Sequence, residues 1–135
     1  MRSVLTALAV LAAGCGGSEA PRYSLRMVML EMELRRADIE GALLRDGGLA
    51  EIEEEVAKIR GWLADPAKEA YFDSGNARGT RAQFDAFEEG FRPRLDALSA
   101  AAASGDLAAT TTAFRALEDG CNACHAVFRP DLAQR

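Results

Sequence analysis

The chain has 135 residues, which is enough for one domain with a real hydrophobic core. Its formal net charge is −5 at neutral pH, and an acidic surface argues against binding to nucleic acid or to anionic lipid. It contains 3 cysteines and 1 histidine, so a metal or redox site made of thiols and imidazoles has few possible ligands.

The first 15 residues have the pattern of a secretory signal. A short basic start is followed by an apolar run from Val4 to Ala13, which is too short to span a bilayer. The small residues before Cys15 resemble a bacterial lipobox, with Leu11 one position earlier than the usual leucine. We therefore expect residues 1–15 to be a signal peptide and Cys15 to be lipidated, and an ordinary cleaved signal is the alternative.

Residues 16–21 follow as a flexible Gly/Ser-rich tether. Loss of the signal removes one basic residue, Arg2, and changes the formal charge from −5 to −6. We expect an exported protein on the periplasmic face, held to a membrane only through its lipid.

Residues 22–135 show a helical apolar period throughout. The first helix is predicted from Arg22 to about Arg45, and Asp46-Gly47-Gly48 ends it. Pro66 limits the second helix. Its predicted buried stripe is Leu49, Ile52, Val56, Ile59 and Leu63.

Residues from about 67 to 79 are predicted to be irregular, with turn residues at Gly75 and Gly79. Thr80 and Gln83 form a predicted capping box that opens a third helix, and Pro93 is expected to kink or split it. Its predicted stripe is Phe84, Phe87, Phe91, Leu95 and Leu98.

Asp106 is the predicted N-cap of the last helix. Its inward positions are Leu107, Thr110, Phe114, Leu117, Cys121, Cys124 and Phe128. Four amphipathic helices with short loops predict an all-α fold, an antiparallel four-helix bundle.

The last helix carries Cys121-Asn122-Ala123-Cys124-His125, the C-x-x-C-H spacing of c-type haem attachment. Two thiols on one helical face can each bond a haem vinyl group, and the next histidine offers the proximal iron ligand. Zinc would need about four ligands, and a thioredoxin-like site would need a neighbouring βαβ pattern. With one thiol assigned to lipid and two to haem, none is left for a structural disulfide.

A helical bundle with one C-x-x-C-H near its C-terminus resembles the cytochrome c′ superfamily, as does the following Phe128-Arg129 pair. The resemblance implies one covalently attached haem c and a distal residue supplied by the first helix. It also implies that Arg129 lies near the proximal imidazole and that Arg26 contacts a haem propionate.

The first helix offers Met29 as the sixth iron ligand, with Leu30 or Met32 as alternatives for the distal position. On a helical wheel, Met29 and Met32 share one apolar face, and Leu30 belongs to a nearly opposite apolar face. The second face predicts either contact with other helices or a homodimer through this helix.

A methionine ligand closes the iron and raises its potential, which suits electron transfer. The sequence therefore predicts an electron-transfer cytochrome that is not an enzyme and that serves a redox partner protein. One alternative is a five-coordinate haem protein that binds a small gas such as nitric oxide. Another is a haem-free helical envelope lipoprotein with an adventitious C-x-x-C.

Overall fold

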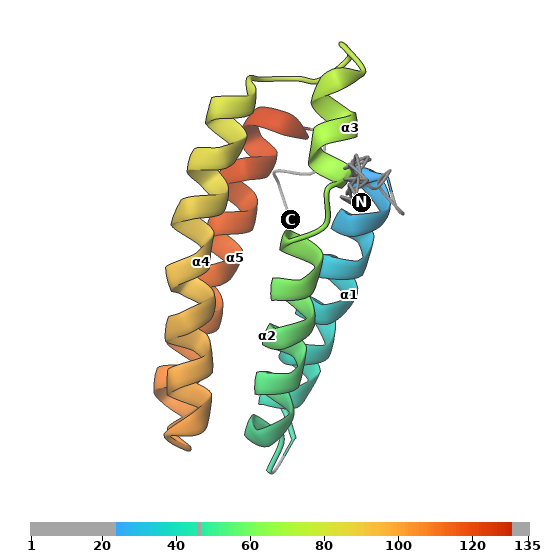
Figure 1. Cartoon of the computed structure of the whole chain (residues 1–135). Helices are drawn as coiled ribbons and strands as arrows, with labels where there is room; N and C mark the ends of the chain where they lie inside the picture. The colour runs from blue at the N-terminus through green and yellow to red at the C-terminus, as the bar shows by residue number, and fades with distance from the viewer. Residues whose placement is uncertain (1–23, 46, 131–135) are drawn as a thin grey trace, which may run out of the picture.

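The computed structural model describes residues 24–45 and 47–130, and these residues form helices joined by short turns (Figure 1). The predicted signal peptide with Cys15 and the tether at residues 16–21 lie outside the described residues. The helices are α1 (Leu25–Leu43), α2 (Leu49–Leu63), α3 (Ala67–Asp73), α4 (Arg81–Ala103) and α5 (Leu107–Phe128).

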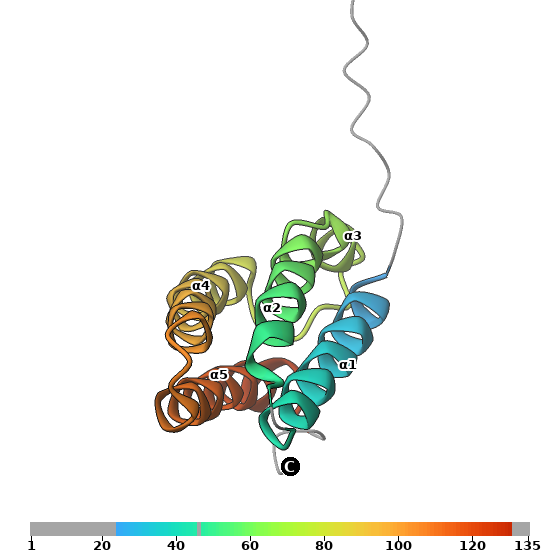
Figure 2. The same ribbon diagram turned by 90° about the horizontal axis from the view of Figure 1, so that it is seen from below.

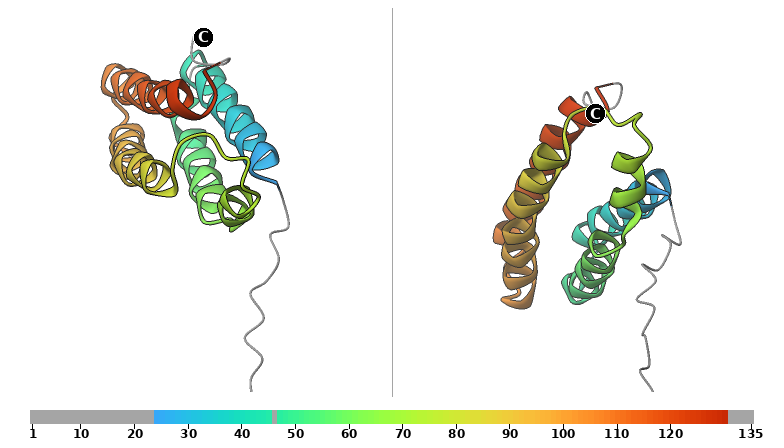
Figure 3. Two further views of the ribbon diagram at one scale, coloured as in Figure 1. Left: turned by 90° about the horizontal axis from the view of Figure 1, so that it is seen from above. Right: turned by 45° about the horizontal axis from the view of Figure 1, so that its top comes forward.

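The four long helices make a bundle of two pairs, which confirms the predicted all-α four-helix bundle. Along the chain, each long helix runs in the opposite direction to the one before it (Figure 1). Seen end-on, α1 and α2 form one pair and α4 and α5 the other (Figure 2). The short α3 extends the α1–α2 pair at the end of the bundle where α4 begins and α5 ends (Figure 3).

One half of the bundle is filled by aliphatic side chains from α1, α2 and α4, and α5 adds the buried Phe114. Ile39, Ile52, Val56, Leu95 and Leu98 are all completely buried there. They recur at three- and four-residue steps, so each helix buries one stripe against the others. We call this half, next to the α1–α2 and α4–α5 turns, the closed end.

The helix starts follow the predicted capping chemistry. Thr80 and Gln83 form a complete capping box, in which the Thr80 hydroxyl accepts a hydrogen bond from the backbone N–H of Gln83 at 3.2 Å. The Asp106 carboxylate accepts from the Ala109 amide at 2.9 Å. The first described helix begins later than predicted, because Ser24 caps it through the Met27 amide.

One expectation about the middle of the chain is wrong, and one of the two alternatives for Pro93 is wrong. The stretch after Pro66 holds the helix α3, which has Pro66 at its N-cap position, and the Asp65 carboxylate accepts a hydrogen bond from the Ala67 amide at 2.8 Å. Pro93 does not split α4, which continues from Arg81 to Ala103. Pro93 lies on the exposed side of α4, where water can reach the carbonyl that loses its amide partner.

The prediction that Leu107 belongs to the buried stripe of the last helix is also wrong. Leu107 is 51% exposed. None of the described helices has the length and hydropathy of a membrane-spanning segment.

Candidate functional site

The last two turns of α5 carry the motif residues. Cys121, Cys124 and His125 are all partly buried, and α5 extends beyond them to Phe128. The Arg129 amide donates to the His125 carbonyl at 2.7 Å and closes the helix end. The helix therefore fixes the imidazole and both thiols in one rigid frame.

Three adjoining pockets surround this motif in the described part of the chain. The inner pocket lies between α1, α2, α4 and α5, the end pocket lies under α3, and the side groove runs between α1 and α5. Met29 and His125 line all three pockets. The three pockets therefore adjoin at Met29 on α1 and His125 on α5, and we call the half of the bundle that holds them the cavity end.

The walls of the inner pocket are mainly apolar. Phe84, Phe87 and Phe91 on α4 line it together with Ile59 and Leu63 on α2. An aromatic cluster closes its outer end, where the Phe84 and Phe128 rings meet edge to face at 5.4 Å. Such walls exclude water from a flat apolar group held between them.

Both motif thiols are held in their neutral form. Burial raises the pKa of Cys121 to about 12, and the negative charge of Glu33 adds to this. Burial also raises the pKa of Cys124 to about 11. A neutral thiol is a weaker nucleophile and a weaker metal ligand than a thiolate.

Charged side chains border the cavity where it opens to solvent. Arg26 and Arg129 both line the end pocket and the side groove. Arg36 bridges α1 and α5 through a hydrogen bond to Glu118 at 2.9 Å and also pairs with Glu33 at 3.0 Å. The guanidinium groups at the mouth suit anionic substituents of a bound group.

The three distal alternatives occupy different places. Met29 lines all three pockets, whereas Met32 lines only the inner one. Leu30 lines only the side groove and is 54% exposed. It lies with Met27 and Leu34 on the outward face of α1, as the two-faced wheel predicted.

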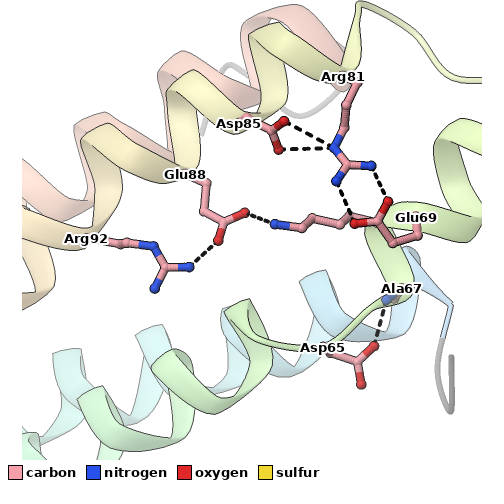
Figure 4. Close-up of polar contacts among 8 residues, drawn as sticks. Asp65, Ala67, Glu69, Arg81, Asp85, Glu88 and Arg92 are labelled. Atoms are coloured by element: carbon pink, nitrogen blue, oxygen red, sulfur yellow. Dashed lines mark hydrogen bonds and ion pairs between the residues drawn. The ribbon is translucent and has the colours of Figure 1, made fainter. Parts of the chain in front are cut away.

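Sequence reasoning missed three charged residues that line the inner pocket, Glu33, Arg36 and Glu88. Glu88 is only 8% exposed and forms ion pairs with Lys68 and Arg92 (Figure 4). Its position was readable, because it lies four residues after Phe84 and three before Phe91, on the face that α4 buries. It was overlooked because the stripe was defined by apolar residues alone.

The residues present fit a covalently bound haem. The cavity combines two thiols and an imidazole on one helix, apolar walls for a porphyrin face and arginines at the mouth for propionates. In the residues that the structure describes, no three histidine, cysteine or acidic side chains gather as a metal site.

Comparison with known proteins agrees with this chemistry. A family model described as Cytochrome C′ matches residues 49–129, which is more than half of the chain. The match includes the motif on α5 and leaves out α1 with Met29 and Arg26. No curated protein and no solved structure matches the chain. The chain therefore belongs to the cytochrome c′ family, which implies a covalently bound haem c and whose members are typically exported to the periplasm.

Proposed function

We propose that the protein is a monohaem electron-transfer cytochrome. Cys121 and Cys124 bond the haem, His125 is the proximal iron ligand and Met29 is the sixth ligand. The observation that carries this proposal is that Met29 on α1 and His125 on α5 line the same three adjoining pockets. A bound haem c supplies a one-electron iron couple in this site.

The chain's own residues have separate roles in this proposal. The phenylalanines of α4 exclude water from the porphyrin faces, which favours transfer of an electron without other chemistry. The Met29 sulfur raises the potential and leaves no open position on the iron. Arg26 and Arg129 hold the propionates at the mouth of the cavity. Nothing in this arrangement calls for a catalytic role, and we propose none.

The sixth ligand is tested with the haem-loaded protein, produced with the haem-attachment machinery. We expect its ferric absorption spectrum to contain a sulfur-to-iron charge-transfer band. Met29→Leu should abolish this band, and Met32→Leu is the matched control that should retain it. If only Met32→Leu loses the band, Met32 is the sixth ligand, one helical turn after Met29. If the unmodified protein lacks the band, methionine ligation is contradicted.

The second candidate is a five-coordinate haem protein that binds nitric oxide or another small neutral gas. The apolar wall of Ile59, Leu63 and the α4 phenylalanines favours it, because these side chains contain no atom that can bind iron. A high-spin ferric spectrum in the unmodified protein would select this candidate. The haem-free alternative conflicts with membership of a family whose haem is covalently bound.

We also propose that the protein is a homodimer through α1. Met27, Leu30, Leu34 and Leu44 expose large apolar side chains along the outward face of this helix. Analytical ultracentrifugation should show a dimer that Leu34→Glu converts to a monomer. A monomeric unmodified protein would contradict the dimer without affecting the haem site. Lipid on Cys15 is a separate proposal, which mass spectrometry of the membrane fraction tests.

A further inference from the structure

Glu88 is a buried acid in an otherwise apolar stretch of the cavity wall. Its side chain is 7% exposed, and it lines the inner pocket with Cys121, Cys124 and His125. Its helix neighbours on the same face are Phe84 and Phe91, which are also buried. A carboxylate in such surroundings is costly to bury unless cations accompany it.

Two cations accompany it, from different elements. Lys68 on α3 and Arg92 on α4 each form an ion pair with a different oxygen of the Glu88 carboxylate (Figure 4). The Lys68 side chain is 22% exposed and the Arg92 side chain 54% exposed. The negative member of this triad is thus the one that faces the cavity, and the positive members lie nearer to water.

The neighbouring pairs do not share this placement. Arg81 binds Glu69 on α3 and Asp85 on α4, and neither acid lines the cavity (Figure 4). These pairs are close to half exposed, so water screens their charges. Attachment of α3 to α4 therefore does not by itself explain why one acid enters the cavity wall.

We propose that Glu88 sets the reduction potential of the haem by stabilising the ferric state, and that Lys68 and Arg92 limit this effect. Oxidation adds one positive charge at the iron, and a carboxylate inside the same low-dielectric cavity interacts with that charge more strongly than an exposed one. The inference rests on the proposed attachment of haem at Cys121 and Cys124. It does not depend on whether methionine is the sixth ligand.

The test measures midpoint potentials of the haem-loaded protein by spectroelectrochemical titration. Glu88→Gln keeps the shape and removes the charge, and should raise the reduced-to-oxidised ratio at a fixed electrode potential about tenfold. This corresponds to about 59 mV for a one-electron couple. Lys68→Gln should shift the ratio in the opposite direction by about threefold, because this cation is partly screened.

The control is Asp85→Asn, one turn earlier on α4, which removes an acid outside the cavity and should change the ratio by less than about twofold. A purely structural role predicts that Glu88→Gln and Lys68→Gln shift the potential in the same direction or leave it unchanged, and either result overturns the inference. If Glu88→Gln does not fold, the midpoint potentials of Lys68→Gln and Arg92→Gln decide. Lower potentials support the inference, and unchanged or higher potentials overturn it. A protein that takes up no haem overturns the proposed function as well, whereas a haem protein with unmoved potentials overturns this inference alone.

Discussion

The closed end and the cavity end of the bundle are built from the same four long helices with the same apolar period, yet they are packed differently. At the closed end, aliphatic side chains such as Ile52, Val56, Leu95 and Leu98 are fully buried. At the cavity end, the inward positions hold larger or more flexible side chains, namely Met29, Met32 and the phenylalanines of α4, and these surround open space. Charged groups enter the wall there, and α3 is added over the end.

This difference separates stability from function along each helix. A close-packed interior loses free energy with every methylene removed, whereas a wall around a cavity has fewer contacts to lose. The closed end therefore holds the bundle together and frees the cavity end to keep space for a group that the chain does not itself supply.

The largest expected effect concerns the thiols of the cavity end. In the haem-free protein at pH 8, Cys121 should react with a thiol-alkylating reagent about a thousandfold more slowly than in denaturant, because its pKa is raised from 9.0 to about 12 and the thiolate is the nucleophile. The same shift predicts that the contribution of Cys121 to haem-free stability is fully present below about pH 9 and is lost as the pH rises toward 12.

The measurement is mass spectrometry of alkylated protein against time, with circular dichroism as the check that the helices are formed. Equal rates in helical and denatured protein would show that the thiols are not buried.

Truncation of side chains should distinguish the two ends. Leu98→Ala at the closed end should lower the free energy of unfolding of the haem-free protein by about 2–5 kcal/mol, since Leu98 is completely buried. Met32→Ala at the cavity end should cost about 1 kcal/mol, because that side chain already borders open space. Urea titrations measure both, and equal losses would contradict the distinction.

A smaller effect is expected where the turn before α4 contacts the end of α5. Gly79 has a φ of +68°, and a Cβ there would lie 2.7 Å from the Phe128 ring. Gly79→Ala should therefore destabilise the protein by about 2–3 kcal/mol through backbone strain and displacement of the ring.

Gly75→Ala is the matched control, because Gly75 has a φ of +70° and nothing within 4 Å of its Cβ position. It should cost only about 1 kcal/mol in the same urea titration. If the two variants lose the same free energy, Phe128 does not pack against this turn.

The sequence predicted correctly those parts of the fold in which a single physical effect determines the local structure. Apolar spacing predicted the stripes of α2 and α4, and capping chemistry predicted the starts at Thr80 and Asp106. The motif on α5 was predicted from spacing and agrees with the family match over residues 49–129. The role of Met29 stays a prediction, because that match leaves out α1.

The rest depended on competing effects that one sequence does not rank. Pro66 follows the end of α2 and also occupies the N-cap position of α3, where the Asp65 carboxylate accepts a hydrogen bond from the Ala67 amide. Pro93 was expected to kink or split α4, and the helix is not split, because Pro93 lies on its exposed side. Glu88 lies on the buried face and pairs there with Arg92 of its own helix and with Lys68, which comes from another helix.

The central claim is that Met29 and His125 hold the iron from α1 and α5. Its most direct test is the absorption spectrum of the ferrous haem protein before and after carbon monoxide is added. A methionine-ligated iron predicts a sharp, split ferrous spectrum that carbon monoxide does not change, and Met29→Leu should make the spectrum respond. A ferrous spectrum that shifts with carbon monoxide in the unmodified protein would contradict the claim and indicate an open iron that binds gas.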